Sequence, residues 1–130
     1  MASIFLDTNA YSAFLLGNQT LAHEISSSEG IHLSLIVLGE LLAGYRRGSR
    51  KEENLRDLET FLAKPNTRLT LPTRNSADYY ALIKNQLRQK GKPIPANDIW
   101  IAAQCLEHGA VLLSRDTHFE HVEGLRLKRF

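Results

Sequence analysis

The segment that decides the fold is SIFLDTN, residues 3–9, in which a short apolar run ends at an acid. Residues 3–6 have the length and the apolar character of a buried β-strand. The next residues, Asp7, Thr8 and Asn9, favour a turn into a helix, because short polar side chains cap helix N-termini. A buried strand that leads directly into a helix is typical of α/β proteins with a parallel sheet.

The rest of the chain repeats this alternation of short apolar runs and longer amphipathic stretches. We predict further strands at 31–35, 68–71 and 110–114, and a short edge strand at 125–127. We predict helices at 9–16, 21–28, 37–47, 52–62, 75–90 and 98–108, with Asn97 as the N-cap of the last one. This order predicts an α/β fold with a central, mainly parallel sheet.

Length and composition are those of an ordinary globular protein. The 130 residues can bury one hydrophobic core, so we expect a single domain over residues 1–130. No apolar run reaches the roughly 18 residues that a membrane helix needs. The apolar run before Asp7 is also too short for a signal peptide, so we expect a cytoplasmic protein. The only cysteine, Cys105, excludes an internal disulfide and fits a reduced thiol in the core.

Four acidic residues lie at positions where the neighbouring sequence is apolar. Asp7 directly follows the predicted strand at 3–6, and Asp116 lies two residues after the one at 110–114. Parallel α/β sheets bind ligands at these ends of their strands. Glu40 and Asp98 lie within or beside apolar helical runs, where an ionised carboxylate is costly to desolvate without a partner or a cation. Taken singly, Asp7 and Asp98 also fit helix caps and Asp116 fits a turn, whereas Glu40 is harder to explain structurally.

The four acids are best explained together, as a metal site. Two carboxylates about 4 Å apart repel by roughly 4 kcal/mol at an effective dielectric near 20, so a cluster stays ionised when a cation is bound. Carboxylate oxygens suit Mg²⁺ or Mn²⁺. The histidines His108, His118 and His121 lack a companion cysteine pattern, so zinc spacing is not indicated.

The contexts of these acids resemble the PIN domain family, and in particular the VapC-type toxins of toxin–antitoxin systems. The matching stretches are FLDTN at residues 5–9, LGEL at 38–41, NDIWIAA at 97–103 and SRDTHF at 114–119. Their order and spacing resemble the family along essentially the whole chain. One such stretch would be a weak signal, and four in order are more specific.

The resemblance implies a three-layer α/β/α PIN-like nuclease domain and metal-dependent endoribonuclease activity, in which one or two Mg²⁺ or Mn²⁺ ions activate water. It implies that Asp7, Glu40 and Asp98 are the main metal-binding residues and that Asp116 is the fourth acid. Ser114 matches a family Ser/Thr whose hydroxyl orients a neighbouring carboxylate, and Thr8 and Asn9 match positions that line the site. The implied partners are an RNA substrate, a cognate antitoxin and a second copy of the chain in a homodimer.

Basic residues offer candidate contacts to RNA. The net charge of +2 and the pI near 8.8 are compatible with a nucleic-acid partner without requiring one. From two basic groups we predict RNA contacts for Arg46 and Arg47, and for Lys84 and Arg88. The alternatives are that these cations are solvated surface near helix ends, or that Arg46 and Arg47 pair with acids of the antitoxin.

Two other functions fit an acidic pocket. A Mg²⁺-dependent phosphohydrolase of small phosphate esters would typically carry a second acid two residues after the first, and Asn9 occupies that position. A non-catalytic module could use the acidic pocket only to bind Mg²⁺, but a receiver-like domain would carry a lysine after a late strand, where the chain has Ser114-Arg115-Asp116. Both remain alternatives to the ribonuclease.

Overall fold

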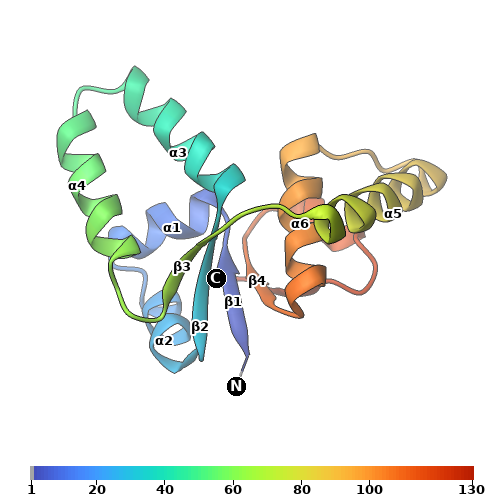
Figure 1. The fold of residues 1–130 in the computed structure, drawn as a ribbon, viewed down its shortest axis with the longest axis horizontal. Helices are drawn as coiled ribbons and strands as arrows, with labels where there is room; N and C mark the ends of the chain where they lie inside the picture. The colour runs from blue at the N-terminus through green and yellow to red at the C-terminus, as the bar shows by residue number, and fades with distance from the viewer. Residues whose placement is uncertain (1) are drawn as a thin grey trace.

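A five-stranded parallel sheet forms the centre of the molecule in the computed structural model, which describes residues 2–130 (Figure 1). The strands are β1 (Ser3–Leu6), β2 (Gly30–Ser34), β3 (Thr67–Thr70), β4 (Val111–Leu113) and β5 (Arg126–Lys128). Their order across the sheet is β3-β2-β1-β4-β5, and each neighbouring pair is parallel. The central position of β1 places the acid that follows it in the middle of the carboxyl edge.

In the part of the chain that the structure describes, six α-helices cover the two faces of this sheet. They are α1 (Thr8–Leu15), α2 (Gln19–Ser27), α3 (Leu35–Arg47), α4 (Lys51–Leu62), α5 (Arg74–Lys90) and α6 (Ala96–His108). Helices α1 to α4 lie on one side of the strands and α5 and α6 on the other (Figure 1), which confirms the predicted three-layer α/β/α arrangement. Within residues 2–130, no helix is long and apolar enough to cross a membrane.

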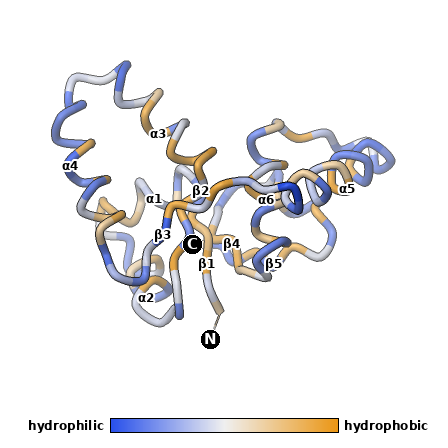
Figure 2. The backbone as a smooth tube through the Cα atoms, viewed as in Figure 1, coloured by the Kyte–Doolittle hydropathy of each residue, from blue (hydrophilic) through white to orange (hydrophobic). Residues whose placement is uncertain are grey.

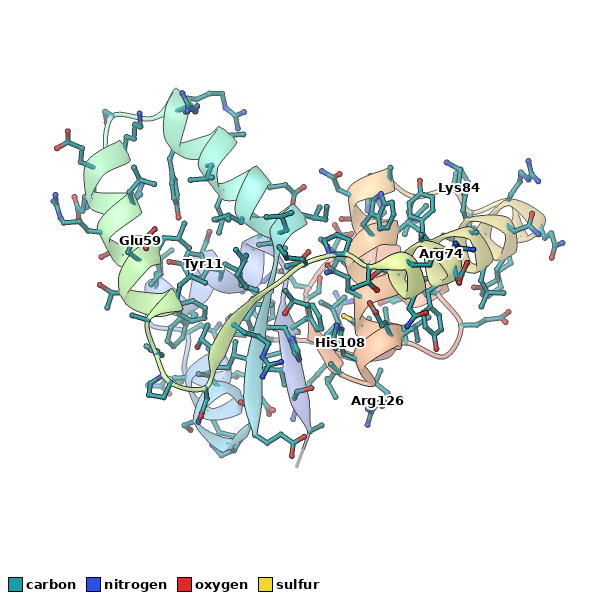
Figure 3. All side chains as sticks on the ribbon, viewed as in Figure 1. Tyr11, Glu59, Arg74, Lys84, His108 and Arg126 are labelled. Carbon is teal, nitrogen blue, oxygen red and sulfur yellow. The ribbon has the colours of Figure 1, made fainter. Side chains whose placement is uncertain are left out.

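The core lies between the sheet and the inner faces of the helices. The tube in Figure 2 is hydrophobic along much of the sheet and hydrophilic along much of α4 and α5. Phe5, Leu33 and Leu112 are fully buried on the three central strands. Tyr11 extends from α1 toward α4, where its ring packs edge-on against Phe61 at a centroid distance of 5.0 Å (Figure 3).

Most helix and strand ends lie within one or two residues of their predicted positions, with two differences near the carboxyl edge. The prediction that Asn97 caps the last helix is wrong: α6 begins at Ala96 and its N-cap is Pro95. The sequence also did not predict the 3-10 helix η1 (Thr117–His121), a single short turn with no apolar periodicity. Both differences change which side chains reach the space above β1 and β4.

Candidate metal centre

A cleft of about 630 Å³ lies at the carboxyl edge of the sheet, where α1, α3 and α6 meet. Its lining residues are Asp7, Thr8, Asn9, Glu40, Arg47, Pro95, Ala96, Asn97, Asp98, Ile101, Asp116 and His118. The structure therefore brings all four acids singled out from the sequence into one cleft, although they are far apart in the chain.

Asp7 lies at the base of this cleft and is 6% exposed. As the N-cap of α1, its Oδ1 accepts a hydrogen bond of 2.8 Å from the backbone N–H of Ala10. The buried Ser114 hydroxyl donates a hydrogen bond to the other carboxylate oxygen. Burial raises the pKa of Asp7, the hydrogen bonds from Ser114 and Ala10 oppose this rise, and the charges of Asp98 and Asp116 add to it.

Glu40 joins three helices through its two carboxylate oxygens. The Thr8 hydroxyl, at the start of α1, donates a hydrogen bond of 2.6 Å to Oε1. The Asn97 side chain, in the first turn of α6, donates one of 3.3 Å to Oε2. Because α6 begins at Ala96, Asn97 belongs to the helix and reaches across to α3 instead of capping its own helix.

Asp98 and Asp116 lie close together in the cleft, and His118 contacts both of them. The Nδ1 atom of His118 lies 3.0 Å from Asp98 Oδ2 and 3.2 Å from Asp116 Oδ1. Burial raises the pKa of Asp98, the hydrogen bond with His118 opposes this rise, and the charges of Asp116 and Glu40 add to it. Asp116 is the N-cap of η1, and its Oδ1 accepts a bond of 2.9 Å from the backbone N–H of His118.

Three side chains of the cleft form a cluster whose donor atoms suit a divalent cation. Asp98, Asp116 and His118 each offer one ligand atom, and these atoms lie within 4.8 Å of one another, the only such group of three found among residues 2–130. Asp7 and Glu40 line the same cleft with their oxygens already hydrogen-bonded, and a carboxylate oxygen retains a second lone pair for a metal. Hard oxygen donors with one imidazole are a suitable ligand set for divalent metal ions.

His118 was missed by the sequence analysis, which considered it only as a zinc ligand. The available signal was its position two residues after Asp116, in a polar turn at the end of a strand. Of the basic residues predicted to contact RNA, Arg47 lines the acidic cleft and Arg46 is exposed beside it on α3. Lys84 and Arg88 instead line a separate, mainly apolar pocket between α5 and α6, and Figure 3 shows Lys84 on α5.

Known proteins are similar to this chain over three quarters of its length or more. The PIN domain family matches residues 4–125. Ribonuclease VapC1 of Haemophilus influenzae is 28% identical over 127 residues, covering 93% of this chain and 92% of that protein. Ribonuclease VapC2 of the same organism is 33% identical over 99 residues, covering 75% and 74%. The structure of VapBC2 from Rickettsia felis, bound to a DNA fragment from their promoter, aligns with a TM-score of 0.85 at 26% identity, covering 98% of each chain.

The chain therefore belongs to the PIN domain family, in its VapC group. PIN nucleases generally depend on divalent metal ions, and the cluster of acids around Asp98 is the part of this chain that suits such an ion.

Proposed function

We propose that this chain is a metal-dependent endoribonuclease that acts in the cytoplasm as the toxin of a type II toxin–antitoxin pair. The observation that carries the proposal is the convergence of Asp7, Glu40, Asp98 and Asp116 in one cleft. Such a concentration of carboxylates suits cation-assisted attack on a phosphodiester, which is itself negatively charged. The VapC relatives, which are named ribonucleases, support RNA as the substrate.

In this proposal the four acids hold one or two Mg²⁺ or Mn²⁺ ions, and residues 1–130 form a single nuclease domain. The bound ion supplies Lewis acidity, which activates water and offsets charge on the phosphodiester. Ser114 orients Asp7 through its hydroxyl, and Thr8 orients Glu40. Asn9 lines the same cleft and is exposed, so it is available to the substrate.

Arg47 is the proposed contact to the RNA phosphates nearest the reaction. It lines the cleft together with the acids, and its guanidinium can bind the negatively charged phosphates of an RNA strand. Arg46, one residue earlier on α3, would extend this contact along the backbone. Lys84 and Arg88 lie outside the acidic cleft, so they would bind phosphates only at a distance from the cut.

A cognate antitoxin and a second copy of the chain are the proposed protein partners. The similarity to the VapBC2 structure supports the antitoxin. Leu15 and Leu16, 43% and 89% exposed at the end of α1, are apolar side chains available to such a partner. Coexpression with a small neighbouring gene product, followed by copurification and analytical ultracentrifugation, would test both the complex and the homodimer.

The proposed activity is tested by incubating purified protein with cellular RNA in Mg²⁺, in Mn²⁺ and in a chelator. We expect cleavage only with a metal, and we expect none from Asp7→Asn or Asp98→Asn. Asp57→Asn, which changes an exposed acid on α4, is the matched control and should cut normally. Activated water leaves the 2′-hydroxyl uninvolved, so products should carry 5′-phosphate and 3′-hydroxyl ends. Equal cleavage by Asp7→Asn would show that the proposed site is wrong.

A further inference from the structure

His118 is the one side chain of the cluster whose donor atom is a nitrogen. Its Nδ1 lies 3.0 Å from Asp98 Oδ2 and 3.2 Å from Asp116 Oδ1, and the side chain is 44% exposed at the cleft. Its ring therefore approaches both carboxylates through the same atom while remaining open to solvent.

The spacing of the three donor atoms matches the spacing of ligands around a small cation. In an octahedral site with metal–ligand bonds of about 2.1 Å, neighbouring ligand atoms are about 3.0 Å apart. The two distances from His118 Nδ1 agree with two such edges, and all three atoms lie within 4.8 Å of one another.

The backbone around His118 holds its ring in this place. The backbone N–H of His118 donates to Asp116 Oδ1 at 2.9 Å, and the backbone N–H of Asp116 donates to the Ser114 hydroxyl at 3.0 Å. The next residue, Phe119, is buried in the core and anchors η1. The position of the imidazole is therefore set by a short, anchored turn, and little ordering would be needed when a cation binds.

We propose that His118 Nδ1 is a ligand of the divalent cation held by Asp98 and Asp116, and that it makes this centre prefer Mn²⁺ to Mg²⁺. The proposal rests on the metal-dependent function proposed above and adds a ligand outside the acidic set. Mg²⁺ strongly prefers oxygen ligands, whereas imidazole nitrogen binds first-row transition metal ions. A ligand nitrogen carries no proton, so the neutral ring would bear its proton on Nε2.

The same distances would also suit a hydrogen bond from a protonated Nδ1, which would make His118 a positioning residue. The two roles differ in a measurable way. A ligand places nitrogen directly on the metal and affects Mn²⁺ more than Mg²⁺. A positioning residue acts only through the carboxylates, so its loss would weaken the binding of both ions alike.

Pulsed EPR of the Mn²⁺-loaded protein distinguishes these roles without any RNA. We expect modulation from a directly bound ¹⁴N nucleus in the wild type and its loss in His118→Asn. Asparagine places an amide near the position of Nδ1, so it can keep the hydrogen bond to Asp98 while removing the imidazole. His121→Asn is the matched control, because His121 lies in the same 3-10 helix and does not line the cleft.

Calorimetric titration with each ion gives the second readout. We expect His118→Asn to weaken Mn²⁺ binding about tenfold and to change Mg²⁺ binding by less than about threefold. Absence of the nitrogen signal in the wild type, or equal weakening of both ions, would overturn the proposal. Cleavage of RNA without a nitrogen signal would contradict only this inference, whereas nitrogen-bound Mn²⁺ without RNA cleavage would contradict only the proposed function.

Discussion

The hydroxyl of Ser114 donates a hydrogen bond to Asp7 Oδ2, joining residues that are 107 positions apart in the chain. The two residues follow neighbouring parallel strands, in which Leu6 is paired with Leu113. The same hydroxyl oxygen accepts a hydrogen bond of 3.0 Å from the backbone N–H of Asp116. One buried side chain thereby fixes two of the four acids relative to each other.

Ser114→Ala is therefore expected to reduce the rate of metal-dependent RNA cleavage. It removes the bond that orients Asp7, and loss of such a partner behind a metal ligand typically costs about tenfold to a hundredfold in activity or metal affinity. The hydrogen bond from Ser114 also opposes the raised pKa of Asp7, so its removal should move the acidic limb of the rate profile to higher pH. Initial rates of RNA cleavage from pH 5 to 9 would measure both effects.

Two variants serve as controls for this prediction. Ser114→Thr retains the hydroxyl and should recover most of the activity, while Ser12→Ala removes an exposed hydroxyl from α1 and should have no effect. An unchanged rate and an unchanged profile in Ser114→Ala would mean that Asp7 is oriented without this bond.

Asp7→Asn should make the metal-free protein more stable while removing its activity. Asparagine can still cap α1, but it carries no charge to desolvate and none to repel Asp98 and Asp116. Because burial raises the pKa of Asp7 in the folded state, the cost of its charge appears as the pH rises through that pKa. Urea unfolding in a chelator should give a gain of about 1 kcal/mol at pH 7 that disappears at low pH. A loss of stability at pH 7 would contradict this account.

The sequence predicted the four acids because each one interrupts or ends an apolar run, a pattern that depends only on neighbours in the chain. It also predicted the parallel sheet, since alternating strands and helices leave few other arrangements. That Asp7 and Asp116 lie on the same edge then follows from strand direction alone. What it could not give was the order of the strands, which places β1 between β2 and β4.

The missed contacts depend on irregular backbone. His118 reaches Asp98 only because residues 117–121 form a 3-10 turn, and a turn of that length has no periodic signature. Asn97 reaches Glu40 only because α6 begins two residues earlier than predicted. An N-cap residue has a non-helical backbone and a first-turn residue has a helical one, so a small error at a helix start changes where that side chain points.

Gln104 forms a buried link between α6, the helix that carries Asp98, and the ends of strands β2 and β3. It is fully buried, its side-chain oxygen accepts a hydrogen bond from Ser34, and its Nε2 donates one of 3.1 Å to the backbone oxygen of Thr70. Ser34 is also the N-cap of α3, with a bond of 3.1 Å from the backbone N–H of Ile36.

Gln104→Leu should destabilise the protein by about 2–4 kcal/mol, because it leaves two buried polar groups without a partner. Chemical denaturation followed by circular dichroism would measure this change. Gln89→Leu, an exposed position on α5, is the control and should remain within about 0.5 kcal/mol of the wild type. A similar effect of both substitutions would mean that water satisfies the groups around Gln104.

His32 should make the stability fall as the pH drops from about 6.5 to about 4. His32 is 7% exposed, and its ring stacks on that of Phe5 at a centroid distance of 4.4 Å. The ring of His108, labelled in Figure 3 at the end of α6, lies at a centroid distance of 4.9 Å from that of His32. Burial lowers the pKa of His32 to about 4, and the positive charges of His108 and Arg68 add to this shift. In this window the unfolded chain binds a proton that the folded protein does not, so the loss in the free energy of unfolding approaches about 3 kcal/mol.

Urea unfolding from pH 7 to 4 measures this effect. The free energy of unfolding should depend less steeply on pH in His32→Gln than in the wild type or in His23→Gln, an exposed control on α2. Equal slopes in all three proteins would assign the acid sensitivity to other groups.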